Sequence, residues 1–154
     1  MLLIVFYLGD VMYMLKHEAV REIVPLVSLH KVTKTPNYIT GFFNYREKLV
    51  PVIDLRQLLQ GTPCIERLST RILLVEKQTQ EQEPTLFGVI AERVTETVQK
   101  NSEDFIARDQ ALNVLESKHM PLLAGFIIEQ SSMVECLDIT KIPYCLENEV
   151  FSLV

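Results

Sequence analysis

Short apolar segments separated by turn residues follow one another along the chain, and no long helical period competes with them. The segments are rich in Val, Ile, Phe and Tyr, which is typical of antiparallel β-sheet. The strands predicted from this pattern are 2–8, 11–15, 39–45, 49–55, 70–76 and 85–98. The pattern therefore predicts an all-β chain.

Polar residues between these segments predict where the chain reverses. Gly9-Asp10 separates the first two strands, and because Gly tolerates positive φ this pair predicts a tight hairpin turn. Arg46-Glu47-Lys48 predicts a polar tip for a second hairpin, and the polar segment 77–84 predicts the tip of a third.

Three short segments have helical signals. In residues 17–24, Val20, Ile23 and Val24 lie at helical spacing before Pro25, which predicts one or two turns. Residues 57–61 predict another short turn. Asn101 or Ser102 is a candidate cap for a helix through residue 108, with acidic residues in its first turn.

A sequence repeat relates the two halves of the chain. Gly41-Phe42 is followed after seven positions by Val50, one further position and then 52–55; Gly125-Phe126 is followed at the same spacing by Val134 and 136–139. The next-to-last position of each copy is an Asp, Asp54 in the first and Asp138 in the second. A strand with one Gly precedes each copy, Gly9 before the first and Gly88 before the second. Repetition predicts two similar small barrels packed together, because barrel closure removes exposed strand edges.

Composition and charge narrow the class of protein. The chain has 154 residues, 48% hydrophobic and 23% charged, which fits one ordered domain. The net charge of −5 leaves no excess of basic residues to neutralise phosphates, so we expect no nucleic-acid partner. Gly9, Asp10 and Lys16 interrupt the apolar N-terminal segment, so we expect no direct membrane insertion.

The cysteines and histidines indicate neither metal nor catalytic chemistry. Cys64, Cys136 and Cys145 are odd in number and widely spaced, which fits a reducing cytoplasm rather than disulfides or zinc; Cys136 is predicted to be a core residue. The histidines have no paired metal spacing, and nucleophile and phosphate-binding motifs are absent from the sequence. We therefore expect no enzyme activity, no metal and no cofactor.

The segment 39–56, ITGFFNYREKLVPVIDLR, resembles the signature of the CheW-like chemotaxis adaptor family: Gly, two positions, Asn-x-Arg-Gly, then Val/Ile-Pro-Val-Ile-Asp-Leu. Residues 20–23, VREI, are similar to the V-x-E-I segment of the family. Residues 137–142, LDITKI, are similar to its closing Leu-Asp-x-x-Lys-Ile. The resemblance covers nearly the whole chain.

The resemblance implies two SH3-like five-stranded β-barrels packed around a shared apolar interface, with a few short helices. It implies a non-catalytic adaptor between the cytoplasmic tip of a chemoreceptor and a CheA-type histidine kinase. We expect a cytoplasmic protein recruited to receptor arrays at the inner membrane. We expect a single domain over 1–147, with a first barrel over 9–71, a second barrel over 2–8 plus 72–147, and a tail over 148–154.

The resemblance also assigns residues. Those expected to bind the receptor are Val20, Glu22, Arg46, Gly88 and Val94. Those expected to bind the kinase are Pro25, Ser28 and Leu29. The residues of the structural motif are Gly41, Asn44, Pro51, Asp54, Gly125 and Asp138.

Several of these residues have a second interpretation. Val20 lies at a position that is more often used for core packing, and Arg46 fits either a loop-locking or a partner-binding role. Asp54 could be a catalytic carboxylate, but its repetition as Asp138 favours a capping role.

A small-effector site between the barrels and a β-barrel hydrolase are the alternative functions of the protein. An adaptor of twitching or surface sensing is the alternative pathway.

Two positions depart from the family pattern. Glu47 stands where the family has Gly after the Arg, which predicts either a different turn or strain of about 1 kcal/mol. Glu92 stands where the family usually has Asp. A carboxylate beside Arg46 could also alter the choice of partner.

Overall fold

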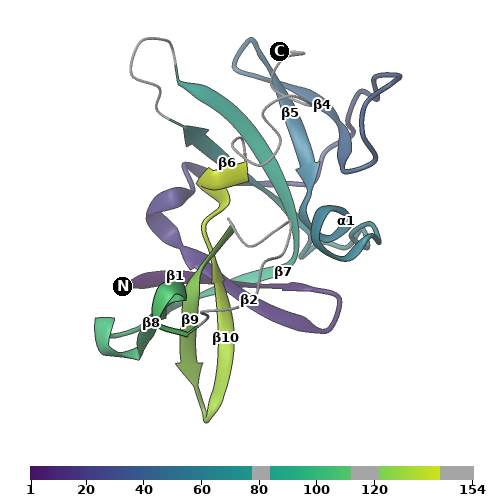
Figure 1. Cartoon of the computed structure of the whole chain (residues 1–154). Coiled ribbons are helices and arrows are strands. Elements are labelled where there is room, and N and C mark those ends of the chain that lie inside the picture. The colour runs from purple at the N-terminus through teal and green to yellow at the C-terminus, as the bar shows by residue number, and fades with distance from the viewer. Residues whose placement is uncertain (78–83, 112–121, 143–154) are drawn as a thin grey trace.

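The computed structural model describes residues 1–77, 84–111 and 122–142, and these are mostly β-strand (Figure 1). The strands are β1 Leu2–Leu8, β2 Val11–Lys16, β3 Glu22–Pro25, β4 Ile39–Tyr45, β5 Lys48–Asp54, β6 Arg71–Lys77, β7 Thr85–Gln99, β8 Phe105–Ala107, β9 Leu123–Glu129 and β10 Ser132–Leu137. The helical segments are α1 Leu55–Gln60, α2 Arg108–Ala111 and the 3-10 turns η1 His17–Ala19, η2 Ser102–Asp104 and η4 Ile139–Lys141.

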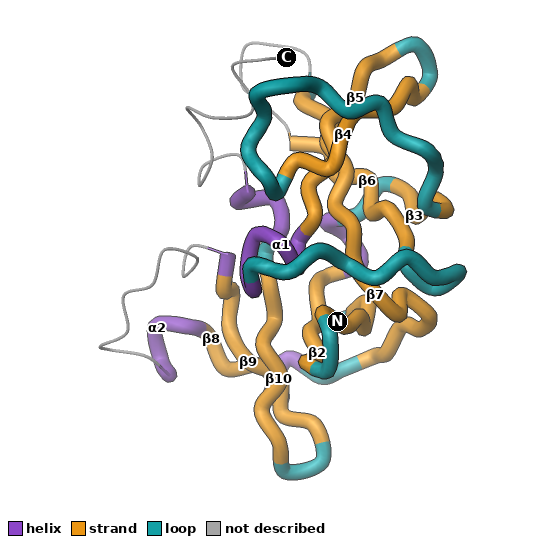
Figure 2. The backbone as a smooth tube through the Cα atoms, turned by 90° about the vertical axis from the view of Figure 1, so that its right-hand side faces the viewer, coloured by secondary structure: helices purple, strands orange, loops and turns teal. Residues whose placement is uncertain are grey.

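The long strand β7 belongs to two curled sheets. Its first part pairs with β6 and, in parallel, with β5; its second part pairs with β1. The first sheet has the order β3-β6-β7-β5-β4, and the second continues from β7 through β1, β2, β10 and β9 to β8. These sheets form the upper and lower halves of the molecule in Figure 2. The predicted all-β chain with two small packed barrels is confirmed.

The division of strands between the barrels differs from the predicted 9–71 and 2–8 plus 72–147. Strand β2 pairs with β1 and β10 in the second barrel, whereas β6 pairs with β3 and β7 in the first. The tight turn at Gly9, where φ is 64°, keeps β1 and β2 adjacent, so a boundary at residue 9 is wrong. The predicted tail lies outside the described residues.

Two helix predictions are also corrected. Only residues 17–19 of the predicted 17–24 helix are helical, because the β-branched Ile23 and Val24 pair with β6 as part of β3. In place of the predicted helix through residue 108, the chain forms one 3-10 turn, η2, and then strand β8, which pairs with β9. Asn101 makes no side-chain cap hydrogen bond there.

The repeat in the sequence is a repeat in the backbone. Gly41 pairs with Val52 in the β4–β5 hairpin, and Gly125 pairs with Cys136 in the β9–β10 hairpin, with a register shift on the same side of each glycine. The N–H of Asp54 donates to Tyr38 O, and the N–H of Asp138 donates to Leu122 O, both at 2.7 Å. The upstream glycines are not equivalent, because Gly9 lies in a turn and Gly88 within β7.

Apolar side chains of the described residues fill three clusters, and the largest lies between the two barrels. It combines Phe6 and Leu15 of the second barrel with Ile53 and Phe87 of the first. Smaller clusters fill the barrel interiors, one around Val52 and Ile72, the other around Leu3, Met14 and the predicted core residue Cys136. Alternate side chains of β1 and of β6 thus face a barrel interior and the shared interface.

Candidate protein-interaction site

A groove of about 570 Å³ opens on the first barrel between two loops. One loop follows β3 and the other, residues 61–70, follows α1. Lining residues include Val27, Ser28, Leu29, Pro63, Arg67 and Leu68. Leu68 is 100% exposed and Val27 is 45% exposed. Exposed apolar side chains with charged neighbours form the kind of surface that protein partners cover.

The carboxylate of Asp54 fixes the start of loop 61–70. Asp54 is buried; its Oδ1 accepts the Gln57 N–H at 3.0 Å, which caps α1, and its Oδ2 accepts the Cys64 N–H at 2.9 Å. At the end of the loop, the Thr70 hydroxyl donates to Ile65 O at 2.6 Å. The predicted capping role of Asp54 is confirmed, with the loop contact in addition.

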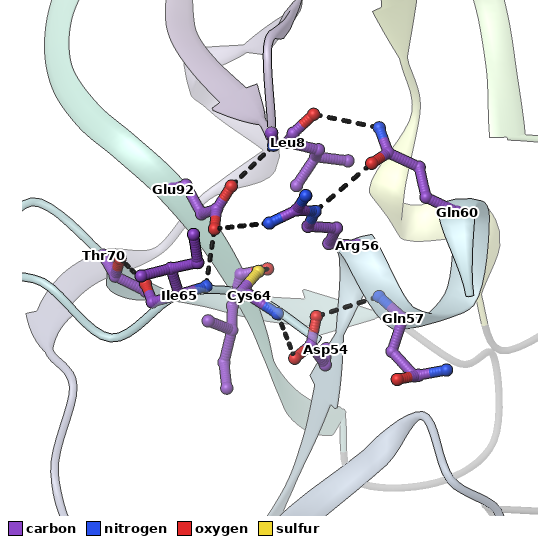
Figure 3. A network of polar contacts seen from close by, with 11 residues as sticks. Leu8, Asp54, Arg56, Gln57, Gln60, Cys64, Ile65, Thr70 and Glu92 are labelled. Atoms are coloured by element: carbon purple, nitrogen blue, oxygen red, sulfur yellow. Dashed lines mark hydrogen bonds and ion pairs between the residues drawn. The ribbon is translucent and has the colours of Figure 1, made fainter. Parts of the chain in front are cut away.

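A second carboxylate holds the loop from the side of the second barrel (Figure 3). Glu92 accepts hydrogen bonds from the N–H groups of Ile65 and Gly9, each at 2.6 Å, and pairs with Arg56 at 3.3 Å. Arg56 Nε also donates to Gln60 Oε1, whose amide nitrogen donates to Leu8 O at 2.9 Å. Polar contacts thus join α1, loop 61–70 and the β1–β2 turn.

A group of charged and aromatic side chains lies at the edge where β3 approaches the β4–β5 hairpin. The Tyr45 hydroxyl donates to Glu22, and the Arg46 guanidinium lies over the Tyr45 ring, 5.1 Å from its centre. Beside them Arg21 pairs with Glu76 at 3.2 Å. The hydrogen bond to Glu22 is the main cause that raises the pKa of Tyr45. We call Glu22, Tyr45 and Arg46 the hairpin edge.

The predicted receptor-binding residues therefore do not form one exposed surface. Glu22 and Arg46 come together through Tyr45. Val20 is half-buried against the shared core, which fits its alternative interpretation. Val94 is 2% exposed and Gly88 is buried, and a Cβ on Gly88 would lie 2.8 Å from Ile72. As contact side chains, Gly88 and Val94 are corrected to packing positions.

The predicted kinase-binding residues lie at the groove. Ser28 and Leu29 line it, and Ser28 is exposed while Leu29 is half-buried. Pro25 is exposed at the end of β3, where the chain enters the groove loop.

The residues of the structural motif have packing and turn roles, with one exception. A Cβ on Gly41 would lie 2.8 Å from His30 O, and one on Gly125 would lie 2.3 Å from Ile106 O, so both positions require close backbone approach. Pro51 is buried, and Asp138 caps η4 through the Thr140 N–H at 3.1 Å. Asn44 is exposed, and nothing in the structure explains its place in the motif.

Sequence reasoning missed three parts of this site. It noted Glu92 only as a departure and passed over Arg56 and Tyr45. A Glu inside an otherwise apolar strand segment, GVIAE, is a signal that could have been followed, because a buried carboxylate needs partners. Nothing local indicates the pairing with Arg56, which is distant in sequence.

The chemistry available at the groove does not indicate catalysis. Burial and the neighbouring Asp54 carboxylate raise the pKa of the Cys64 thiol, which keeps it protonated rather than nucleophilic. Nowhere in 1–77, 84–111 and 122–142 do three or more His, Cys, Asp or Glu gather as a metal site would require. Among the same residues, no helix is both long and apolar enough to span a bilayer.

The fold defines a class of small proteins built from two β-barrels that share one long strand. Within that class, the chain belongs to the CheW-like domain family, whose model matches residues 2–144. Over 145 residues it is 23% identical to the chemotaxis protein CheW of Treponema pallidum (strain Nichols), covering 91% of this chain and 80% of the relative.

Two further likenesses agree with this assignment. Over 99 residues the chain is 31% identical to the chemotaxis protein CheW of Helicobacter pylori (strain ATCC 700392 / 26695), covering 64% of this chain and 57% of the relative. The crystal structure of the scaffolding protein TtCheW from Thermoanaerobacter tengcongensis matches with a TM-score of 0.78 and 23% identity, covering 97% of this chain and 92% of that one. The predicted all-β, CheW-like fold is confirmed by this likeness.

Proposed function

We propose that this protein is a non-catalytic adaptor that couples the cytoplasmic tip of a chemoreceptor to a CheA-type histidine kinase. Family membership supports the adaptor class, since the relatives are chemotaxis proteins and one solved relative is a scaffolding protein. In this proposal the chain acts in the cytoplasm, at receptor arrays on the inner membrane. No turnover, cofactor or nucleic acid is involved.

One observation carries the kinase half of the proposal, the exposed apolar groove beside Ser28 and Leu29. Leu68 is fully exposed there, and an apolar side chain with no cover in the monomer gains by burial in a complex. Lys31, Glu66 and Arg67 supply a charged rim for orientation. We assign this groove to the kinase.

The receptor half of the proposal rests on the hairpin edge. Arg46 is exposed at the tip, and its stacking on Tyr45 orients its guanidinium; a guanidinium presents several donors to carboxylates or carbonyls. Of the two roles open to Arg46, exposure favours partner binding over locking the loop. Glu22 accepts the hydrogen bond of the Tyr45 hydroxyl and so holds the ring on which Arg46 stacks.

A small-effector site between the barrels is not favoured. The cavity at that junction measures about 220 Å³, and two of the polar side chains that line it, Arg56 and Glu92, already pair with each other. Drug-sized ligands occupy pockets of roughly 300–1,000 Å³. A pathway of twitching or surface sensing is not favoured either, since the relatives are chemotaxis proteins.

A reconstitution tests the proposal. Kinase autophosphorylation is measured with receptor fragments, with and without this chain, together with direct binding to each partner. We expect receptor-dependent kinase activity only when the chain is present. Leu68→Glu should weaken kinase binding about tenfold or more, as loss of an interface hot spot does.

Matched variants separate the two surfaces. Leu2→Glu places the same charge at another exposed apolar position and should leave kinase binding unchanged. Arg46→Ala should weaken receptor binding alone, with Lys48→Ala in the same hairpin as its control. Wild-type protein that binds neither partner would refute the adaptor proposal.

A further inference from the structure

Glu92 lies where β7 passes from one barrel to the other, and it is the charged residue buried at this crossing. The residue is only 7% exposed, and its side chain contacts both barrels. Oε1 accepts the N–H of Gly9, whereas Oε2 accepts the N–H of Ile65 and pairs with Arg56. The two oxygens of one carboxylate therefore hold different parts of the molecule (Figure 3).

The donors come from three separate elements. Gly9 forms the β1–β2 turn of the second barrel, with φ at 64°. Ile65 lies in loop 61–70, three residues before the fully exposed Leu68 of the groove. Arg56 lies in α1 and continues the contacts through Gln60 to Leu8. The carboxylate thus links the groove loop of the first barrel to a turn of the second.

Only an ionised carboxylate satisfies this arrangement. It offers acceptors on both oxygens and no donor, and each oxygen faces a backbone N–H at 2.6 Å. An amide in the same place would direct its NH₂ at one of these N–H groups. Burial acts to raise the pKa of the Glu92 carboxyl, but the Ile65 and Gly9 donors and Arg56 outweigh it, so the pKa lies below its ordinary value.

We infer that Glu92 is a positioning residue for partner binding: it sets loop 61–70, and with it the groove, at a fixed place relative to the second barrel. This inference rests on the proposed function of the groove. Glu92 itself contacts no partner. It acts through the Ile65 N–H, which fixes the backbone that presents Leu68, and through the Gly9 turn, which fixes the other barrel.

The test combines amide hydrogen exchange with kinase binding. In Glu92→Gln one of the two N–H groups loses its acceptor, so we expect faster exchange at either Ile65 or Gly9, and about tenfold weaker binding of the kinase regulatory domain. Glu92→Asp keeps the charge and both acceptors on a shorter side chain, and should fall between wild type and Glu92→Gln. Glu96→Gln changes an exposed carboxyl of the same strand and should match wild type.

The outcomes separate this inference from the proposed function. If wild type binds the kinase and folded Glu92→Gln binds equally well, the positioning role is wrong while the adaptor role stands. If wild type binds no kinase, the adaptor role fails, and unchanged exchange at both Ile65 and Gly9 would then overturn the Glu92 inference by itself. Should Glu92→Gln not fold, Glu92→Asp takes its place, because its shorter side chain draws the carboxylate away from both N–H groups. Unchanged exchange at both Ile65 and Gly9 together with full kinase affinity would overturn the inference there.

Discussion

The β4–β5 hairpin of the first barrel and the β9–β10 hairpin of the second have the same backbone plan but different attachments. Asp54 caps α1 and then holds loop 61–70, whereas Asp138, among the residues that the structure describes, caps the 3-10 turn η4. The groove and the buried Glu92–Arg56 pair depend on α1 and loop 61–70. The repeated part therefore builds the frame, and the part that differs builds the candidate site.

The glycines at the start of each repeat test the shared frame, with the largest expected effect. In Gly125→Ala the new Cβ would lie 2.3 Å from Ile106 O and 2.7 Å from the Phe105 ring, so we expect a loss of about 3 kcal/mol in the free energy of unfolding. Gly41→Ala meets His30 O at 2.8 Å and should cost about 2 kcal/mol. Urea unfolding measures both, and equal small losses would contradict the close approach.

The two aspartates test the difference between the copies. Asp54→Ala leaves the N–H groups of Gln57 and Cys64 without their acceptor, and we expect it to cost about 2 kcal/mol. Asp138→Ala removes the half-buried cap of η4 and should cost about 1 kcal/mol. Only Asp54→Ala should also weaken kinase binding, because only Asp54 holds the groove loop. Equal effects on binding would break the comparison.

The hairpin tips test turn strain, whose expected effect on the free energy of unfolding is smaller than that of the glycines or the aspartates. Glu47 and Ser131 both have φ of 68°, each after a residue that is also at positive φ. Glu47 thus adopts the conformation for which the family uses Gly, and the strain alternative of the sequence prediction holds. Glu47→Gly and Ser131→Gly should each raise the free energy of unfolding by about 0.5 kcal/mol. A loss in either variant would mean that the side chain contributes more than the strain costs.

The extent of prediction follows the same division. The hairpins, the repeat and the capping role of Asp54 could be predicted, because turn residues and alternating apolar positions act locally. The place of β2 beside β1 follows from the predicted turn at Gly9. The pairing of β6 with β3 in the first barrel could not be predicted, since it depends on contacts distant in sequence. The helix predicted over residues 17–24 was wrong for a related reason. Apolar side chains at this spacing also fit a strand that is partly covered on both faces, and residues 22–25 form such a strand because Ile23 pairs with Leu73 of β6.

The candidate site was less predictable than the fold. Ser28 and Leu29 do line the groove, but Gly88 and Val94 are buried. Burial depends on how two barrels pack, which no local pattern encodes. Glu92 and Arg56 meet across 36 positions of the chain, so only the unusual carboxyl within an apolar strand was visible beforehand.

The smallest expected effect concerns Glu135, which occupies the place of Pro51 in the repeat. Burial raises the pKa of the Glu135 carboxyl above its ordinary 4.5. A raised folded-state pKa means that the group supports folding below pH 4.5, and that this contribution is lost as pH rises through the folded-state value. Glu135→Gln removes the ionisation and keeps the size. We therefore expect the variant to gain stability relative to wild type between pH 4 and pH 7, by about 1 kcal/mol or less.

Urea unfolding at several pH values measures this difference. Glu92 contributes with the opposite sign, since its pKa is lowered and its support is lost as pH falls below 4.5. The difference between wild type and Glu135→Gln cancels the Glu92 contribution, because both proteins contain it. If the difference in the free energy of unfolding stays constant across the pH range, ionisation of Glu135 does not destabilise the second barrel. Glu135 and the buried Pro51 would then not distinguish the two copies, and the contrast between them would be confined to the groove.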